Sequence, residues 1–231
     1  MGDIDWLVFE LEGTLIDDIA AVRAGAELLA RSHTAPKWTS ARGFRERWCE
    51  ALELSLVRYR RGECTEIEAH RETVRVFDPR LDDEECDRLF RGFFERYLDG
   101  LGVFPDVPSA LFRLGRQVKL GVIARADDAR AKEMVRRVGL SDVISHVVGL
   151  TGRPERSLDP FDYFLKDVGG IGERLAFVGG ELTEEVVAAR RRGVRVVWLN
   201  RRFHRRSPEL PTVRTLDELV EIFWPYMRLS L

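Results

Sequence analysis

Two carboxylates and a hydroxyl follow the first apolar run of the chain. Trp6–Phe9 has the length and composition of a short buried strand, and Gly13 allows the backbone to turn sharply after it. Glu10, Glu12 and Thr14 surround that turn. Carboxylates placed in this way can attack an electrophile, transfer a proton or help to hold a cation. The turn is therefore the first candidate for a functional site.

The eight residues VFELEGTL, from Val8 to Leu15, resemble the first motif of the haloacid dehalogenase (HAD) superfamily, which consists mostly of phosphatases. The family pattern is an apolar run followed by Asp, any residue, Asp, Gly, Thr or Val, and Leu. In the family the first Asp attacks phosphorus, and the second transfers the proton to the leaving group. The resemblance implies that Glu10 and Glu12 occupy the nucleophile and acid/base positions, and that both would also face the metal ion.

Each glutamate places its carboxylate about one bond length farther from the backbone than an aspartate would. Covalent catalysis needs the attacking atom within roughly 3 to 3.5 Å of its target, and a 1 Å misplacement can cost about 10²-fold in rate. Two such changes in one motif predict impaired chemistry.

The second family motif is a Ser or Thr at the end of the next strand, followed by an Asn, which together hold the phosphoryl group. In this chain the two positions fall on Ala124 and Arg125, so the hydroxyl is absent. At the start of a helix, Arg125 could still bind an anion through its guanidinium and the free backbone amides. The other interpretation is a solvated arginine near a helix start.

The third family motif is a Lys that neutralises charge between nucleophile and phosphate. The segment GRPERSLDPF, residues 152–161, admits two registers. In one, Ser157 replaces the lysine and the charge is lost. In the other, Arg153 replaces it and keeps the charge as a planar guanidinium. We favour Ser157, because Pro160 then begins the following helix at the usual spacing.

The fourth family motif ends a strand with Gly-Asp and has a second acid a few residues later, and these acids hold Mg²⁺. Here Gly180 stands where the first acid belongs and offers no carboxylate. Glu185, or alternatively Glu184, keeps the second acidic position. Glu181 could reach the metal or simply favour a helix N-terminus. We therefore expect Mg²⁺ to bind weakly or not at all, and Gly180→Asp to be needed to rebuild a metal site.

The elements expected along the chain place these motifs at one edge of a sheet. From Val118 onward short apolar strands alternate with helices, which predicts a doubly wound parallel sheet of the Rossmann type, an α/β fold. We expect strands at 118–123, 147–148, 175–178 and 194–199, with helices near 127–139, 161–168, 182–192 and 216–223. Ligands bind such sheets at the carboxyl ends of the strands, where all four motifs fall.

A helical segment interrupts this pattern after the first strand. Apolar residues recur every three or four positions within 19–29 and 48–59. Two capping-box pairs predict further helix starts: Thr65 with Glu68, and Asp82 with Glu85. The layout is that of HAD enzymes with an inserted helical cap. We expect a core of residues 1–16 and 103–231 and an all-helical cap of residues 17–102.

Composition narrows the choice of partners and compartment. A net charge of −2 gives no general attraction to nucleic acid or to anionic membranes. The arginines at 190–192, 195, 201, 202, 205 and 206 could bind an RNA, but no pattern of stacking aromatics accompanies them, so we expect a solvated helix end and loop.

Cys49, Cys64 and Cys86 follow no metal-ligand spacing and are expected to be reduced thiols. No signal peptide or long apolar run is present, which predicts a cytoplasmic protein.

These observations favour a HAD-fold protein whose phosphatase site has degenerated, a pseudoenzyme. We expect it to bind a small phosphorylated molecule or anion, or a protein partner, in a binding or regulatory role. The alternative is a Mg²⁺-dependent phosphatase that uses Glu10 as nucleophile and Glu12 as acid/base, with Glu181 and Glu185 on the metal. A dehalogenase is the third choice. That branch of the family also attacks with an aspartate, and this chain has Glu10 at that position.

Overall fold

The computed structural model describes residues 4–31, 41–151, 160–180, 184–201 and 210–223. The chain forms two compact units. One unit contains Met1–Ile16, Val103–Leu150 and Leu158–Leu231, and the other is built on Asp17–Gly102. Two short strands, β2 (Ile16–Asp17) and β3 (Gly102–Val103), pair with each other where the chain passes between the units.

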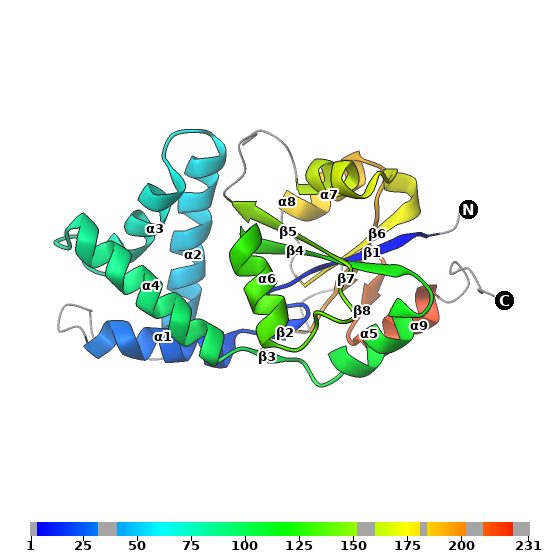
Figure 1. Cartoon of the computed structure of the whole chain (residues 1–231), viewed down its shortest axis with the longest axis horizontal. Coiled ribbons are helices and arrows are strands. Elements are labelled where there is room, and N and C mark those ends of the chain that lie inside the picture. Colours follow the sequence, from blue (N-terminus) through cyan, green and yellow to red (C-terminus); the bar gives the residue numbers. More distant parts are fainter. Residues whose placement is uncertain (1–3, 32–40, 152–159, 181–183, 202–209, 224–231) are drawn as a thin grey trace. The chain divides into compact units, whose positions relative to one another are not determined.

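A six-stranded sheet forms the centre of the first unit, in the order β5-β4-β1-β6-β7-β8 (Figure 1). Its strands are β1 (Trp6–Glu10), β4 (Lys119–Asp127), β5 (His146–Thr151), β6 (Leu175–Gly179), β7 (Arg195–Leu199) and β8 (Thr212–Val213). β1 pairs in parallel with β4 and β6, and β7 pairs in parallel with β6 and β8. The strand order reverses at β1, so the carboxyl end of β1 is the place where such a sheet binds ligands.

Helices cover both faces of this sheet. They are α5 (Val107–Gly115), α6 (Asp128–Arg137), α7 (Pro160–Val168), α8 (Glu184–Arg191) and α9 (Leu216–Phe223), with a 3₁₀ turn η1 at Gly172–Arg174. α7 and α8 lie on one face, and α5 and α9 lie on the other (Figure 1). Phe161 and Phe164 of α7 pack onto Val8, Ile123 and Phe177 of the strands, which buries one apolar face of the sheet.

The second unit is helical in its described residues, with α1 (Ile19–Arg31), α2 (Ala41–Arg60), α3 (Glu66–Arg75) and α4 (Asp83–Asp99). Both predicted capping boxes are confirmed at the starts of α3 and α4. Aromatic rings contribute to the packing of this bundle. Trp48 stacks on Phe93, with ring centroids 3.9 Å apart. No helix in the described part of the chain is long and apolar enough to cross a membrane.

The predicted fold class is confirmed: the protein has an α/β core with a helical insertion after its first strand. Two local predictions were wrong. β4 continues to Asp127, four residues beyond the predicted end. α5 was not predicted at all. This helix begins with Pro108 in its first turn, a position where proline is tolerated.

Candidate functional site

The turn after β1 presents its polar residues at the carboxyl end of the central strand. Gly13 has a φ of +72°, a conformation that glycine adopts at little cost. The amides of Leu15 and Ile16 both donate to the carbonyl of Leu11, at 3.0 and 3.1 Å, and close the turn. Glu10, Glu12 and Thr14 are therefore held within one short, hydrogen-bonded segment.

The Glu10 carboxylate is buried and accepts hydrogen bonds from β4 and from the residue that follows β6. Glu10 is only 5% exposed. Its Oε1 accepts a hydrogen bond from Nη2 of Arg125 at 2.7 Å, and its Oε2 accepts one from the backbone N–H of Gly180 at 3.0 Å. The Thr14 hydroxyl lies 3.5 Å from Oε2, at the outer limit of a hydrogen bond. A buried carboxylate needs such donors, since an isolated charge would be costly there.

The Glu12 carboxylate lies beside the same arginine. Both of its oxygens accept from the backbone N–H of Arg125, at 3.1 and 3.3 Å. Burial of the carboxylate raises the pKa of Glu12 to about 7, although the positive charge of Arg125 opposes this and the negative charge of Glu10 adds to it. The residue as a whole keeps some exposed surface, whereas its carboxylate is enclosed. Glu12 can therefore exist in either protonation state near neutral pH.

Arg125 lies in strand β4 and not at a helix start, which corrects the sequence-based expectation. Its backbone amide is occupied by Glu12. The following helix α6 is capped by the Asp127 side chain, which accepts from the amides of Ala129 and Arg130 at 2.9 Å each. The guanidinium of Arg125, and not free helix amides, is therefore the local cationic group. Ala124, which precedes it, is buried and contributes only a methyl group.

Gly180 packs against the turn after β1. A Cβ atom at this position would lie 2.8 Å from the Thr14 hydroxyl oxygen and 2.9 Å from the carbonyl oxygen of Gly13, closer than side chains allow. The close approach of the Gly13–Thr14 backbone therefore requires a glycine at position 180. Glycine also supplies no metal-binding side chain. The expected rebuilding of a metal site by Gly180→Asp would first require the turn to move.

The basic cluster of the sequence contains a half-buried residue, Arg201, which contradicts the prediction that these arginines are solvated. Nε of Arg201 donates to the carbonyl of Thr14 at 3.1 Å, and Nη1 donates to Oδ2 of Asp106 at 3.1 Å. The guanidinium also lies over the Phe104 ring, 4.1 Å from its centroid. Arg201 therefore stabilises the turn after β1 by a hydrogen bond to the backbone of Thr14. Its position directly after an apolar strand at the carboxyl edge was the signal that could have revealed this.

The described residues do not fit the Mg²⁺ ion that the family resemblance implies. Magnesium needs near-octahedral oxygen ligands. Both Glu10 oxygens accept from N–H donors, and Gly180 supplies no carboxylate. Within the described ranges, no three His, Cys, Asp or Glu side chains are grouped as a metal site would require. The Arg125 guanidinium, a fixed cation, stands beside Glu10 instead.

Five of the residues singled out in the sequence cannot be placed in this site. Arg153, Ser157 and Glu181 lie outside the described residues. Glu185 and its neighbour Glu184 belong to the first turn of α8, where only the backbone is described. The register of the third motif and the second acid of the fourth motif stay predictions.

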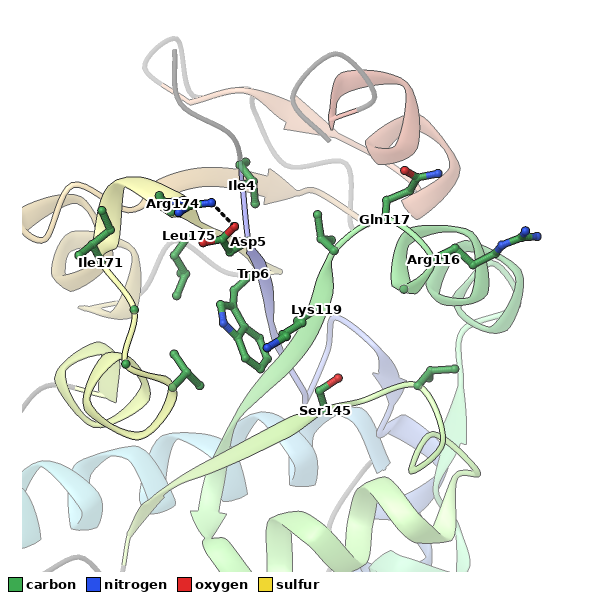
Figure 2. Close-up of a pocket in the computed structure, with 16 residues that line it drawn as sticks. Ile4, Asp5, Trp6, Arg116, Gln117, Lys119, Ser145, Ile171, Arg174 and Leu175 are labelled. Carbon is green, nitrogen blue, oxygen red and sulfur yellow. Dashed lines mark hydrogen bonds and ion pairs between the residues drawn. The ribbon is translucent and has the colours of Figure 1, made fainter. Parts of the chain in front are cut away.

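A pocket of about 500 Å³ lies at the opposite edge of the sheet (Figure 2). Trp6, Lys119 and Leu175, the first residues of β1, β4 and β6, line it together with Asp5 and Arg174. Asp5 and Arg174 form an ion pair in its wall. None of the candidate motif residues contributes to this pocket.

Comparisons with known proteins give distant but extensive similarity. No family profile matches the chain. A phosphoglycolate phosphatase of Neisseria meningitidis serogroup A is 24% identical over 193 residues, which cover 81% of this chain and 76% of that protein. A phosphoglycolate phosphatase of Neisseria gonorrhoeae is 23% identical over the same shares of both chains.

Solved structures show the same architecture. The putative HAD-hydrolase YfnB from Bacillus subtilis, bound to magnesium, superimposes with a TM-score of 0.73 at 17% identity, covering 96% of this chain and 99% of that one. A 2-haloacid dehalogenase from Pseudomonas syringae gives a TM-score of 0.65 at 22% identity with the same coverage of both chains. The chain therefore has the fold of the HAD superfamily, with a helical cap inserted after the first strand, and it is similar to phosphoglycolate phosphatases and haloacid dehalogenases of that fold.

Proposed function

We propose that this protein binds a small phosphorylated molecule, or a related anion, at the carboxyl end of β1, and that its hydrolytic chemistry is impaired. One observation carries this proposal: both oxygens of the Glu10 carboxylate are already bound, at 2.7 Å by Arg125 and at 3.0 Å by the Gly180 amide. A carboxylate held by a guanidinium is a weak nucleophile, because its lone pairs are engaged in charge-assisted hydrogen bonds.

Other features of the site support the same conclusion. Ala124 supplies no hydroxyl for the phosphoryl oxygens, and Gly180 supplies no carboxylate for a metal. Stabilisation of developing charge by such groups is worth about 10² to 10³-fold in rate for each donor. What persists is a fixed cation at the edge of the sheet where ligands bind. This arrangement suits binding or regulation better than turnover.

A Mg²⁺-dependent phosphatase is the second candidate, and the pKa of Glu12 favours it. An acid/base catalyst works best with a pKa near the operating pH, and burial raises the pKa of Glu12 to about 7. The two bacterial relatives named phosphoglycolate phosphatase make phosphoglycolate the first substrate to try.

Hydrolysis of phosphoglycolate and of an aryl phosphate, measured with Mg²⁺ for the parent and for Glu10→Gln, distinguishes the candidates. We expect the two rates to agree within about threefold, since Glu10 does not act as a nucleophile. Calorimetry with phosphoglycolate should detect binding to the parent that Arg125→Ala weakens about tenfold and the matched Arg174→Ala leaves unchanged. If the parent is about 10²-fold faster than Glu10→Gln, Glu10 is a working nucleophile and the impaired-site proposal is wrong.

A further inference from the structure

We infer that the Arg125 guanidinium and the Gly180 backbone N–H form an anion cradle that the Glu10 carboxylate itself occupies, and that a carboxylate or phosphoryl ligand binds by displacing Glu10 without a metal ion. The inference rests on the proposed binding role. It adds that Glu10 is the group that competes with the ligand and that Arg125 is the cation that binds it.

The contacts of Glu10 are those of a bound anion. Oε1 accepts a hydrogen bond from the Arg125 guanidinium at 2.7 Å, and Oε2 accepts one from the Gly180 backbone amide at 3.0 Å. Arg125 lies in β4 and Gly180 directly follows β6, and these strands flank β1 on either side, so the two donors converge on one point. Converging cationic and amide donors at the carboxyl edge of a parallel sheet are what anionic ligands bind.

The register of the strands explains why Glu10 reaches this point. Glu10 pairs with Ile123 across β1 and β4. Since alternate residues of a strand face the same side, Arg125 extends on the same side as Ile123 and therefore beside Glu10. The glutamate stem then carries its carboxylate over the backbone of Gly179 and Gly180, where Oε2 lies 3.5 Å from the position of a Cβ on Gly179.

The cation of the cradle is part of the protein. The Arg125 side chain is 22% exposed and the Glu10 side chain beside it is 7% exposed. The guanidinium neutralises the negative charge of this carboxylate without a metal ion. An external anion that replaces Glu10 would meet the same positive charge. Binding should therefore be independent of Mg²⁺, in contrast to a site whose metal ion bridges the protein and the ligand.

An internal competitor lowers the apparent affinity of every external ligand. The competing carboxylate is attached to the protein and acts at a high effective concentration. Removing it should strengthen anion binding, whereas removing a true ligand-binding or metal-binding carboxylate should weaken it or leave it unchanged. The sign of the effect therefore distinguishes the two roles of Glu10.

The test measures binding of sulfate and inorganic phosphate by calorimetry to the parent, Glu10→Ala and the double variant Glu10→Ala/Arg125→Ala. We expect Glu10→Ala to bind about tenfold more tightly than the parent, equally with EDTA and with excess Mg²⁺, and the double variant to lose that gain. Glu173→Ala, which removes an exposed carboxylate before β6, is the matched control and should bind as the parent does.

The outcomes separate this inference from the proposed function. If folded Glu10→Ala binds both anions no more tightly than the parent, or gains affinity only with Mg²⁺, the self-occupied cradle is wrong even when the parent lacks hydrolytic activity. If Glu10→Ala does not fold, Glu10→Gln replaces it, because its neutral amide keeps the shape and loses the charge. Glu10→Gln should gain about threefold, and an unchanged or weaker affinity would overturn the inference.

Discussion

An arginine–carboxylate pair lies at each end of β1, but the two pairs have different surroundings. At the carboxyl end, Arg125 and Glu10 pair with side chains that are 22% and 7% exposed, and the backbone amide of Gly180 donates to the same carboxylate. At the amino end, about 13 Å away along the strand, Arg174 and Asp5 pair with side chains that are 37% and 41% exposed in the wall of an open pocket. Both ends contain an arginine–carboxylate pair next to the central strand.

The difference shows that an ion pair alone does not mark a functional site. An exposed pair contributes little, because water solvates both partners almost as well. A buried pair must be matched by further donors, since either partner left alone is strongly disfavoured. The convergence of donors on Glu10 is therefore the informative feature, and the size of the pocket at the other end is not.

The largest expected effect comes from Arg125→Met. This substitution leaves the buried Glu10 carboxylate without its cationic partner, and we expect the free energy of unfolding at neutral pH to fall by about 3 kcal/mol. Urea denaturation of the parent and the variant measures the change. A loss below about 0.5 kcal/mol would mean that the pair at the carboxyl end behaves like a surface pair.

Gly180→Ala tests the close packing at the same end. Its Cβ would meet the Thr14 hydroxyl and the Gly13 carbonyl, so we expect a loss of about 2 kcal/mol in the free energy of unfolding. Gly115→Ala, where the nearest atom would lie 3.4 Å from the new Cβ, is the control and should change stability by less than about 1 kcal/mol. Equal losses of unfolding free energy for Gly180→Ala and Gly115→Ala would contradict the close contact between Gly180 and the Gly13–Thr14 turn.

Glu12 should give the carboxyl end a dependence on pH. Because burial raises its pKa from the ordinary value of 4.5 to about 7, the folded state holds this proton more tightly than the unfolded state does. The contribution of Glu12 to stability therefore falls as pH rises from about 4.5 to about 7, and the loss is complete above that window.

Glu12→Gln removes this titration. Between pH 5 and pH 8 the parent should lose about 2 kcal/mol of stability relative to the variant, measured by urea denaturation at both values. Parallel pH profiles of the parent and Glu12→Gln would show that the carboxylate is better solvated than its surroundings imply.

The smallest effect is expected at the amino end. Arg174→Met breaks the exposed pair with Asp5, and the free energy of unfolding should change by less than about 1 kcal/mol. The same denaturation measurement, made at low and high salt, checks this. A loss as large as that of Arg125→Met would remove the contrast between the two ends.

The sequence predicted the features that depend on neighbouring residues. The capping boxes at Thr65 and Asp82 and the helices that follow them are confirmed, because both partners of each box lie three residues apart. The alternation of strands and helices after Val118, and hence the fold class, also depends on short-range patterns. The types of residue at positions 10, 12, 124 and 180 likewise needed no structure to read.

Only the tertiary structure showed how these residues meet. Glu10 binds an arginine 115 positions away, and Thr14 accepts from Arg201, which is 187 positions away. Such pairs depend on strand register and side-chain reach, and a sequence pattern contains neither. The sequence by itself therefore determined which residues stand at the motif positions, whereas the packing of β1 between β4 and β6 decided that Arg125 and the Gly180 amide bind Glu10.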